Sequence, residues 1–353
     1  MSAFIGQLHG DDVRSRREVG PWSSEEMTLI VVNYHYVRPH FEHRFPGIHG
    51  VTASELRTQL ELLGTLGKFV SAAQIRDAVQ GSGSLPARGF LITFDDGLRE
   101  QIDFALPVLD RLGIPALFFV NTWPIANRGV STVHKIHLLR AHTPPTVFCA
   151  LLHTEARRQG LEVRWEVEPA EAAVKYPWDP PEGAQLKYFL NHQLAPEVKD
   201  SLIAPCFRHV FGDDEAAISG VLYMDVEQLR MLGGRDYLGT HGDQHLPLGR
   251  LPRAAVQDNL RMSLERLVGW TGVRPFALSY PFGSLETSTV EAGAVAAELG
   301  VQLGFTMERA ANVDLSRPLH LARFDCNDLP GGREPCFAVE SLFEDVPPAR
   351  WLR

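Results

Sequence analysis

The stretch Gly89-Phe90-Leu91-Ile92-Thr93-Phe94-Asp95-Asp96-Gly97 decides the fold of this chain. Its first six residues are largely apolar, which is typical of a strand buried on both faces of a parallel sheet. The run ends abruptly in two carboxylates and a glycine, and Asp and Gly are common turn residues. In α/β proteins the chemistry is expected where such strands end. We therefore interpret residues 89–97 as a buried strand that carries a candidate site at its carboxyl end.

Strands and helices alternate on both sides of this stretch. Upstream, the apolar run 29–34 predicts a first strand, and Thr52-Ala53-Ser54-Glu55 has the pattern of a capping box that begins a helix. Downstream, the apolar positions over 102–109 predict a helix, and residues 114–120 predict the next strand. The alternation resumes near residue 226 and ends with a strand at 319–324. This rhythm predicts an α/β fold with a parallel sheet.

The rhythm breaks between residues 123 and 205, where the chain reads mostly as helical segments. This part is too long for a loop and too apolar for a disordered linker. Residues 1–26 are polar and lack a periodic pattern, so we expect a loose leader there. The predicted organisation is thus a leader at 1–26, a barrel formed by 27–122 and 206–353, and an inserted helical cap at 123–205.

The composition limits the classes of partner. A net charge of -9 argues against a nucleic-acid or anionic-membrane partner, since both require a basic face. The four cysteines form no CxxC pair, so neither a disulfide framework nor a zinc ribbon is indicated. The first residues lack a long apolar core, and no later stretch reaches transmembrane length. We therefore expect a cytoplasmic protein with no membrane span.

The adjacent carboxylates of Asp95 and Asp96 are the first candidate for chemistry. They repel each other unless a positive charge offsets them. A cation bound by one carboxylate would do so and would leave the other beside the metal as a base. The alternative is an ordinary polar turn, which the dipeptide alone favours.

Two further strand ends carry candidate residues. His241 and His245 follow a predicted strand at 237–240 and supply imidazoles, which are common ligands of zinc-like cations. Since the chain has 14 histidines, such a pair also arises by chance. The stretch 277–283 is a predicted strand that runs into a turn with Pro and Gly. This turn is either purely structural, or it forms a rigid wall of the site whose backbone N–H stabilises an oxyanion.

Taken together, the three strand ends carry a recognisable set of motifs. The order Thr93-Phe94-Asp95-Asp96-Gly97, His241-x-x-x-His245 and Tyr280-Pro281-Phe282-Gly283 resembles the polysaccharide deacetylase family, also called the NodB-homology or carbohydrate esterase 4 family. The resemblance covers roughly residues 28–330, with 123–205 outside the shared core. It implies a distorted (β/α) barrel.

The resemblance also implies roles for single residues. It makes Asp95 the catalytic base, and it makes Asp96, His241 and His245 the ligands of one divalent metal ion, for which we expect zinc. The backbone N–H of Tyr280 would stabilise the oxyanion. One carboxylate and two imidazoles leave coordination positions open for water and substrate, in agreement with this assignment.

Departures from the family pattern raise further candidates. Gly242 stands where the second motif usually has Ser or Thr, and Ser279 stands where the third often has an Arg that pairs with the catalytic Asp. Arg323 would supply that charge, or else it forms a structural salt bridge. The family's Leu-x-His motif, which provides a general acid, has only a weak match at Leu319-His320, so His320 is either that acid or a plain strand histidine.

Other polar residues have two interpretations each. His35 follows the first strand and would line the site or simply pack. His49 lies in a loop that would fold over the site or remain at the surface. In the inserted segment, His134, Lys135 and Lys187 would meet a phosphate or carboxylate of the substrate, or they belong to solvated helix faces.

These observations together predict a hydrolase that removes an N-acyl group, acetyl or formyl, from an amino sugar. A cytoplasmic location and an inserted cap favour a nucleotide-linked, lipid-linked or other small sugar as the partner. The alternatives are an amidohydrolase of the same fold that opens cyclic imides or ureides, a sugar O-deacetylase, and a non-catalytic carbohydrate-binding protein that retains the metal. Asp95 argues against the last, because metal binding does not require it.

Overall fold

The computed structural model describes residues 27–39, 50–163, 166–176 and 179–351. The predicted leader and His49 lie outside these residues. The described chain separates into two compact units, one of residues 142–210 and the other of the flanking stretches up to 141 and from 211 onward. The helical unit is thus shorter at its amino end than the predicted segment 123–205, because residues 123–141 cluster with the barrel.

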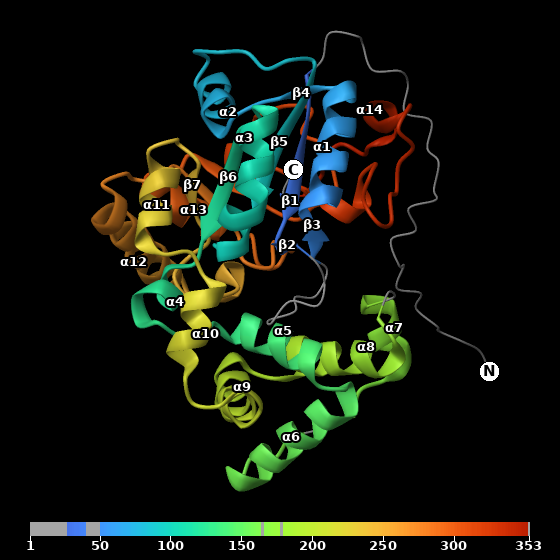
Figure 1. The fold of residues 1–353 in the computed structure, drawn as a ribbon, viewed down its shortest axis with the longest axis vertical. Coiled ribbons are helices and arrows are strands. Elements are labelled where there is room, and N and C mark those ends of the chain that lie inside the picture. Colours follow the sequence, from blue (N-terminus) through green and yellow to red (C-terminus); the bar gives the residue numbers. More distant parts are fainter. Residues whose placement is uncertain (1–26, 40–49, 164–165, 177–178, 352–353) are drawn as a thin grey trace, which may run out of the picture. The chain divides into compact units, whose positions relative to one another are not determined.

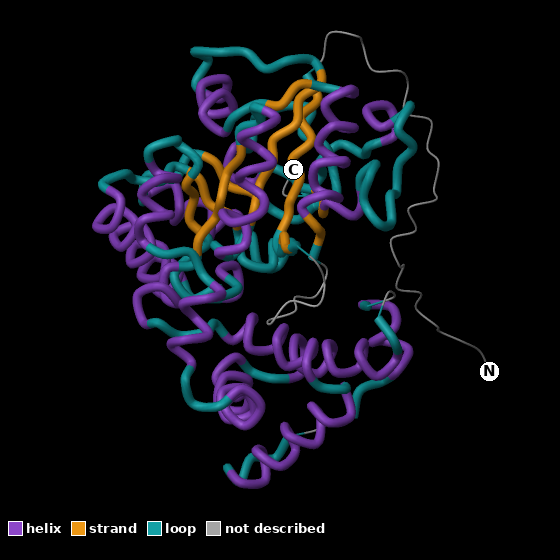
Figure 2. The backbone as a smooth tube through the Cα atoms, in the orientation of Figure 1, coloured by secondary structure: helices purple, strands orange, loops and turns teal. Residues whose placement is uncertain are grey.

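The larger unit is built on one parallel sheet of eight strands, drawn in orange in Figure 2. The strand order is β10-β1-β5-β6-β7-β8-β9, and β4 pairs with β5. The strands are β1 (Thr28–Tyr34), β4 (Lys68–Phe69), β5 (Arg88–Phe94), β6 (Ala116–Val120), β7 (Leu238–Thr240), β8 (Ala277–Ser279), β9 (Leu303–Phe305) and β10 (Phe324–Asp325). A separate pair is formed by β2 (Val37–Arg38) and β3 (Val51–Thr52).

The two ends of the sheet meet through a short link. Leu321 precedes β10, and its N–H donates to the Gly304 carbonyl on β9 at 2.8 Å, while its own carbonyl accepts from the Thr306 N–H at 2.8 Å. The predicted strand at 319–324 is therefore wrong in extent, because residues Pro318–His320 form a 3-10 turn. The predicted distorted (β/α) barrel is confirmed.

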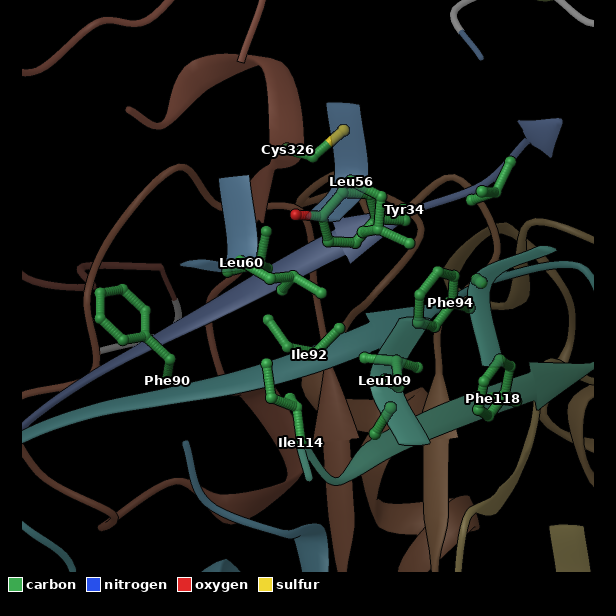
Figure 3. Packing of buried hydrophobic residues seen from close by; sticks show 14 of the residues in the cluster. Tyr34, Leu56, Leu60, Phe90, Ile92, Phe94, Leu109, Ile114, Phe118 and Cys326 are labelled. Carbon is green, nitrogen blue, oxygen red and sulfur yellow. The ribbon is translucent and has the colours of Figure 1, made fainter. Parts of the chain in front are cut away.

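Both faces of the central strands are buried, as the apolar run 89–94 predicts. On one face, Ile92 and Phe94 of β5 pack under the helices, and the same cluster contains Leu56 of α1 (Ala53–Leu66) and Leu109 of α3 (Leu106–Leu112) (Figure 3). On the other face, Leu91 lies in a cluster made mainly of strand residues. Burying one such side chain is worth about 1.5–3 kcal/mol. Since both faces contribute, neither face of the sheet is open to solvent along β1 and β5.

Helices surround the sheet in this unit, and α1 and α3 lie beside β1, β5 and β6 in Figure 1. The predicted capping box is present, since the Thr52 side chain accepts from the Glu55 N–H and the Glu55 side chain accepts from the Thr52 N–H. The helices are α1 (Ala53–Leu66), α2 (Ala72–Val79), a π-turn (Gln101–Ala105) leading into α3 (Leu106–Leu112), α4 (Thr122–Asn127), α5 (Thr132–His142), α10 (Glu215–Leu222), α11 (Val226–Gly233), α12 (Arg253–Thr271), α13 (Val290–Glu298) and α14 (Leu342–Asp345), with 3-10 turns at Leu248–Arg250 and Cys326–Asp328.

The smaller unit is helical. It contains α6 (Pro145–Arg158), α7 (Pro169–Lys175), α8 (Pro181–Tyr188) with a π-turn at Phe189–Gln193, and α9 (Pro196–Phe211). Leu186 and Phe189 of this unit are buried. Among the described residues of the whole chain, no helix combines the length and apolarity needed to cross a membrane.

Candidate metal centre and catalytic site

The three motifs lie at the carboxyl ends of neighbouring parallel strands. Asp95 and Asp96 follow β5, His241 follows β7, and Tyr280 follows β8. Because β5, β6, β7 and β8 are adjacent in the sheet, one edge of the barrel collects all of these residues. This is the arrangement expected of a catalytic site.

Asp96, His241 and His245 form a compact group. Their ligand atoms all lie within 4.8 Å of one another. The Nε2 atoms of both histidines are 3.6 Å from Asp96 Oδ1. Tetrahedral zinc with bonds of about 2.0–2.1 Å would separate two ligand atoms by about 3.3 Å. One carboxylate and two imidazoles at this spacing therefore fit a single zinc-like cation.

The imidazole of His241 is oriented for this purpose. Its Nδ1–H donates to the Ser279 carbonyl at 2.7 Å, so the lone pair of Nε2 faces Asp96. Metal-binding histidines commonly have such a partner on the second nitrogen. His245 differs, because its Nδ1 is buried and has no hydrogen-bond partner in the described part of the chain.

Gly242 departs from the family pattern for a reason visible in the structure. It has φ +73°, and a Cβ there would lie 2.7 Å from Asn259 Oδ1 on α12. That oxygen accepts from the Asp243 N–H at 3.0 Å. The Asp243 carboxylate also accepts from Thr122 Oγ1 at 2.6 Å and from Arg266. Asp243 and Asn259 thus hold the loop between the two histidines. The only sign of this role in the sequence is that a charged residue, Asp243, lies between His241 and His245.

Asp95 and Arg323 form a buried bidentate ion pair. Arg323 Nη1 and Nη2 donate to the two oxygens of Asp95 at 2.9 Å each, and Asn33 donates to the second oxygen at 3.1 Å. Nη2 of Arg323 also donates to Ser279 Oγ at 2.8 Å. Arg323 therefore stands beside Asp95, and Ser279, which occupies the place of the family's usual Arg, contacts it.

The charge of Arg323 keeps Asp95 ionised. Burial alone would raise the pKa of Asp95, but the Arg323 charge and its hydrogen bonds, assisted by His241, lower this pKa to about 2. Gln101 Nε2 donates to the backbone carbonyls of both His35 and Asp95, at 2.9 and 2.6 Å, so the ends of β1 and β5 are tied together here. At neutral pH the Asp95 side chain is a carboxylate that can accept a proton.

Backbone strain is concentrated at the site. Of the five non-glycine residues with positive φ in the described chain, Asp96, His245 and Phe282 belong to the three motifs, with φ of 79°, 56° and 65°. A left-handed conformation costs roughly 1–2 kcal/mol for each such residue. Such strain clusters at functional sites, where the surrounding structure over-determines it.

The prediction for Tyr280 is wrong in the structure. Its backbone N–H donates to the Phe305 carbonyl at 3.1 Å as β8 pairs with β9, so it is not available to an oxyanion. Pro281 has no N–H, and the next donor is that of Phe282. This N–H has no partner in the described chain, and the Phe282 ring lies 4.8 Å from that of His245. Phe282 therefore replaces Tyr280 as the candidate oxyanion donor.

His320 also lies elsewhere than the general-acid interpretation requires. Its Nε2 is 3.2 Å from the Thr289 carbonyl at the start of α13, and its ring stacks on that of Tyr280 at 5.6 Å. None of its hydrogen bonds in the described chain reaches Asp95, Asp96 or the ligand histidines. The 3-10 turn that replaces the predicted strand directs this residue toward α13.

The two lysines of the inserted segment form ion pairs. Lys135 Nζ lies 2.9 Å from Glu215 Oε1, and Lys187 Nζ lies 2.5 Å from Asp179 Oδ2 within the helical unit. His134 is fully buried and contacts Asp96, with its Nε2 3.2 Å from Oδ2. Sequence patterns located these residues, but they did not indicate that His134 meets a metal ligand.

The sequence profile described as Polysaccharide deacetylase matches residues 82–191. Over this segment, which carries Asp95 and Asp96, the chain is similar to the polysaccharide deacetylase family. This similarity supports a hydrolase of the deacetylase type. No curated protein matches the chain significantly.

Three solved structures share the fold. The Streptococcus pyogenes deacetylase PplD, solved in complex with acetate, is 13% identical with a TM-score of 0.55, and the match covers 92% of this chain and 100% of that one. A de-N-acetylase from Aggregatibacter actinomycetemcomitans is 15% identical with a TM-score of 0.52, covering 85% and 95%. IcaB from Ammonifex degensii is 19% identical with a TM-score of 0.50, covering 85% and 91%.

Proposed function

We propose that this chain removes an N-acyl group, acetyl or formyl, from an amino sugar and requires one divalent cation, with zinc the expected ion. The observation that carries the proposal is the placement of Asp95, ionised by Arg323, directly beside the group formed by Asp96, His241 and His245. Metal binding alone does not require a second carboxylate held in this way.

Asp96, His241 and His245 would hold the cation, which would supply polarisation of the amide carbonyl and acidification of water. The other steps fall to the residues of the chain. Asp95 takes a proton from the attacking water, and the Phe282 N–H donates to the carbonyl oxygen as it gains negative charge. Oxygen adds to the carbonyl carbon, the C–N bond breaks, and the nitrogen gains a proton.

The source of that last proton follows from the placement of the candidate acids. His320 contacts Thr289 and Tyr280, whereas Asp95 carries the proton removed from water. We infer that Asp95 returns this proton to the leaving nitrogen. The products are then a carboxylate, acetate or formate, and a free amino sugar.

The substrate we propose is small: a nucleotide-linked or lipid-linked amino sugar, or a small glycoside. The net charge of -9 does not favour a polyanionic polymer as the substrate. His35, which follows β1 next to the site, would line the substrate pocket.

The test is a panel assay on the zinc-loaded protein with Asp95→Asn as matched control. Release of acetate and formate is measured from N-acetylated and N-formylated sugar nucleotides, lipid-linked sugars, monosaccharides and polymer. Turnover of an N-acylated small sugar that the control lacks supports the proposal. Turnover only of an O-acetyl ester, only of a cyclic imide, or binding of sugars without turnover would instead assign one of the alternative functions.

A further inference from the structure

A histidine outside the three motifs contacts a metal ligand. His134 on α5 has no exposed surface, and its Nε2 lies 3.2 Å from Asp96 Oδ2. The other oxygen of Asp96, Oδ1, faces the Nε2 atoms of His241 and His245 at 3.6 Å. The two oxygens of Asp96 therefore have different partners, one toward the ligand group and one toward α5.

The direction of the hydrogen bonds follows from the chemistry of the groups. An ionised carboxylate only accepts, so the proton between His134 and Asp96 must be on Nε2. Nδ1 of His134 is then an acceptor, and it lies 2.6 Å from the Tyr223 hydroxyl and 2.9 Å from Ser131 Oγ. The Tyr223 hydroxyl accepts from the Ser131 N–H at 3.0 Å, which leaves its own proton for His134. The result is a buried chain of donors from Tyr223 through His134 to Asp96.

The helix that carries His134 is anchored independently of this chain. Lys135, the next residue, pairs with Glu215 at 2.9 Å, and the same carboxylate accepts from the Val130 N–H at 2.6 Å. Glu215 begins α10 and Tyr223 follows its end. Residues just before and just after the helical unit 142–210 in the sequence thus fix His134 in place.

We propose that His134 is a positioning residue that orients the Asp96 carboxylate, so that Oδ1 alone is presented to the metal. The inference rests on the proposed metal site. Without the His134 donor, the Asp96 carboxylate would keep only the longer hydrogen bond from Asn121 Nδ2 to Oδ1, at 3.3 Å. It could then rotate more readily about its Cβ–Cγ bond, and metal binding would have to order it. Loss of a hydrogen bond to a ligating side chain typically weakens metal affinity by about 10–100-fold.

The test measures zinc affinity by competition with a chelator for the full chain and for three variants. His134→Ala should weaken zinc binding by about 10–100-fold. His134→Gln should recover most of this loss, because its amide N–H can donate to Oδ2. The matched control is His137→Ala, one turn further along α5, where Nδ1 contacts the Tyr36 hydroxyl at 3.0 Å instead of Asp96. It should keep the affinity of the unsubstituted protein.

Thermal unfolding of the metal-free variants separates positioning from folding. If His134→Ala does not fold, Tyr223→Phe is used. It removes the donor to His134 together with the acceptor of the Ser131 N–H, leaves His134 itself in place, and should weaken zinc binding less. The inference is overturned if the zinc affinity of His134→Ala is within threefold of that of the unsubstituted protein. It is also overturned if His134→Gln binds zinc as weakly as His134→Ala does. Both outcomes leave the proposed function unaffected. If the unsubstituted protein binds no divalent cation, the proposed function itself fails.

Discussion

Replacing Arg323 with leucine tests the pairing on which the catalytic carboxylate depends. In the native protein the pKa of Asp95 is lowered from 3.8 to about 2, against the effect of burial. A tenfold change in a proton equilibrium is worth about 1.4 kcal/mol. The ionisation of Asp95, with burial and all neighbouring charges acting together, therefore favours the folded protein by roughly 2–3 kcal/mol at neutral pH. Because the folded pKa is depressed, this contribution is present above pH 3.8 and is lost as the pH falls toward 2.

In Arg323→Leu the carboxylate of Asp95 stays buried without its cation. Breaking a buried pair in this way typically costs about 3–5 kcal/mol. The pKa of Asp95 should rise, because burial then acts against the charged form without the guanidinium, so the acid limb of the activity profile should move to higher pH. Arg323→Leu combined with Asp95→Asn should recover stability relative to Arg323→Leu alone, and it should remain inactive.

The assays are urea unfolding of the metal-free protein at pH 7 and the pH dependence of acetate release. The double-mutant cycle isolates the energy of the pair from the other contacts of Arg323 with Ser279 and Thr306. A loss below 1 kcal/mol in Arg323→Leu, together with an unchanged acid limb, would show that Arg323 is a structural residue and does not control Asp95.

Asp95→Asn should retain zinc, measured by metal analysis, and lose turnover by about two or more orders of magnitude, as expected for a lost general base; full turnover would rule Asp95 out. A chelator should abolish acetate release, and added zinc should restore it; activity that persists in metal-free protein would contradict the metal requirement. Gly242→Ser should lower the melting temperature and the zinc affinity, because φ is +73° and Asn259 Oδ1 lies 2.7 Å from the new Cβ; an unchanged affinity would mean that the loop tolerates the family's usual residue.

Local patterns in the sequence were sufficient for the elements and for the motif residues. The apolar run before Asp95 predicts a strand buried on both faces, since it lacks the alternation of a half-exposed strand. The residues at 52–55 predict a helix start because the two reciprocal hydrogen bonds of a capping box involve neighbours only. The strand ends that carry Asp95, His241 and Tyr280 could be placed on one edge because all parallel strands end on the same side.

Partners distant in the sequence were decided by the tertiary structure. Arg323 reaches Asp95 across 228 positions because Leu321 links β9 to the segment before β10, and no local pattern specifies that register. The same closure decides the surroundings of two candidate residues. Pairing of β8 with β9 engages the Tyr280 N–H, and the turn before β10 directs His320 to α13. His134 meets Asp96 only because α10 and the residues before α5 hold that helix against the end of β5. A hydrogen bond of this kind depends on the packing of whole elements, and packing is a property of the folded chain and not of neighbouring residues.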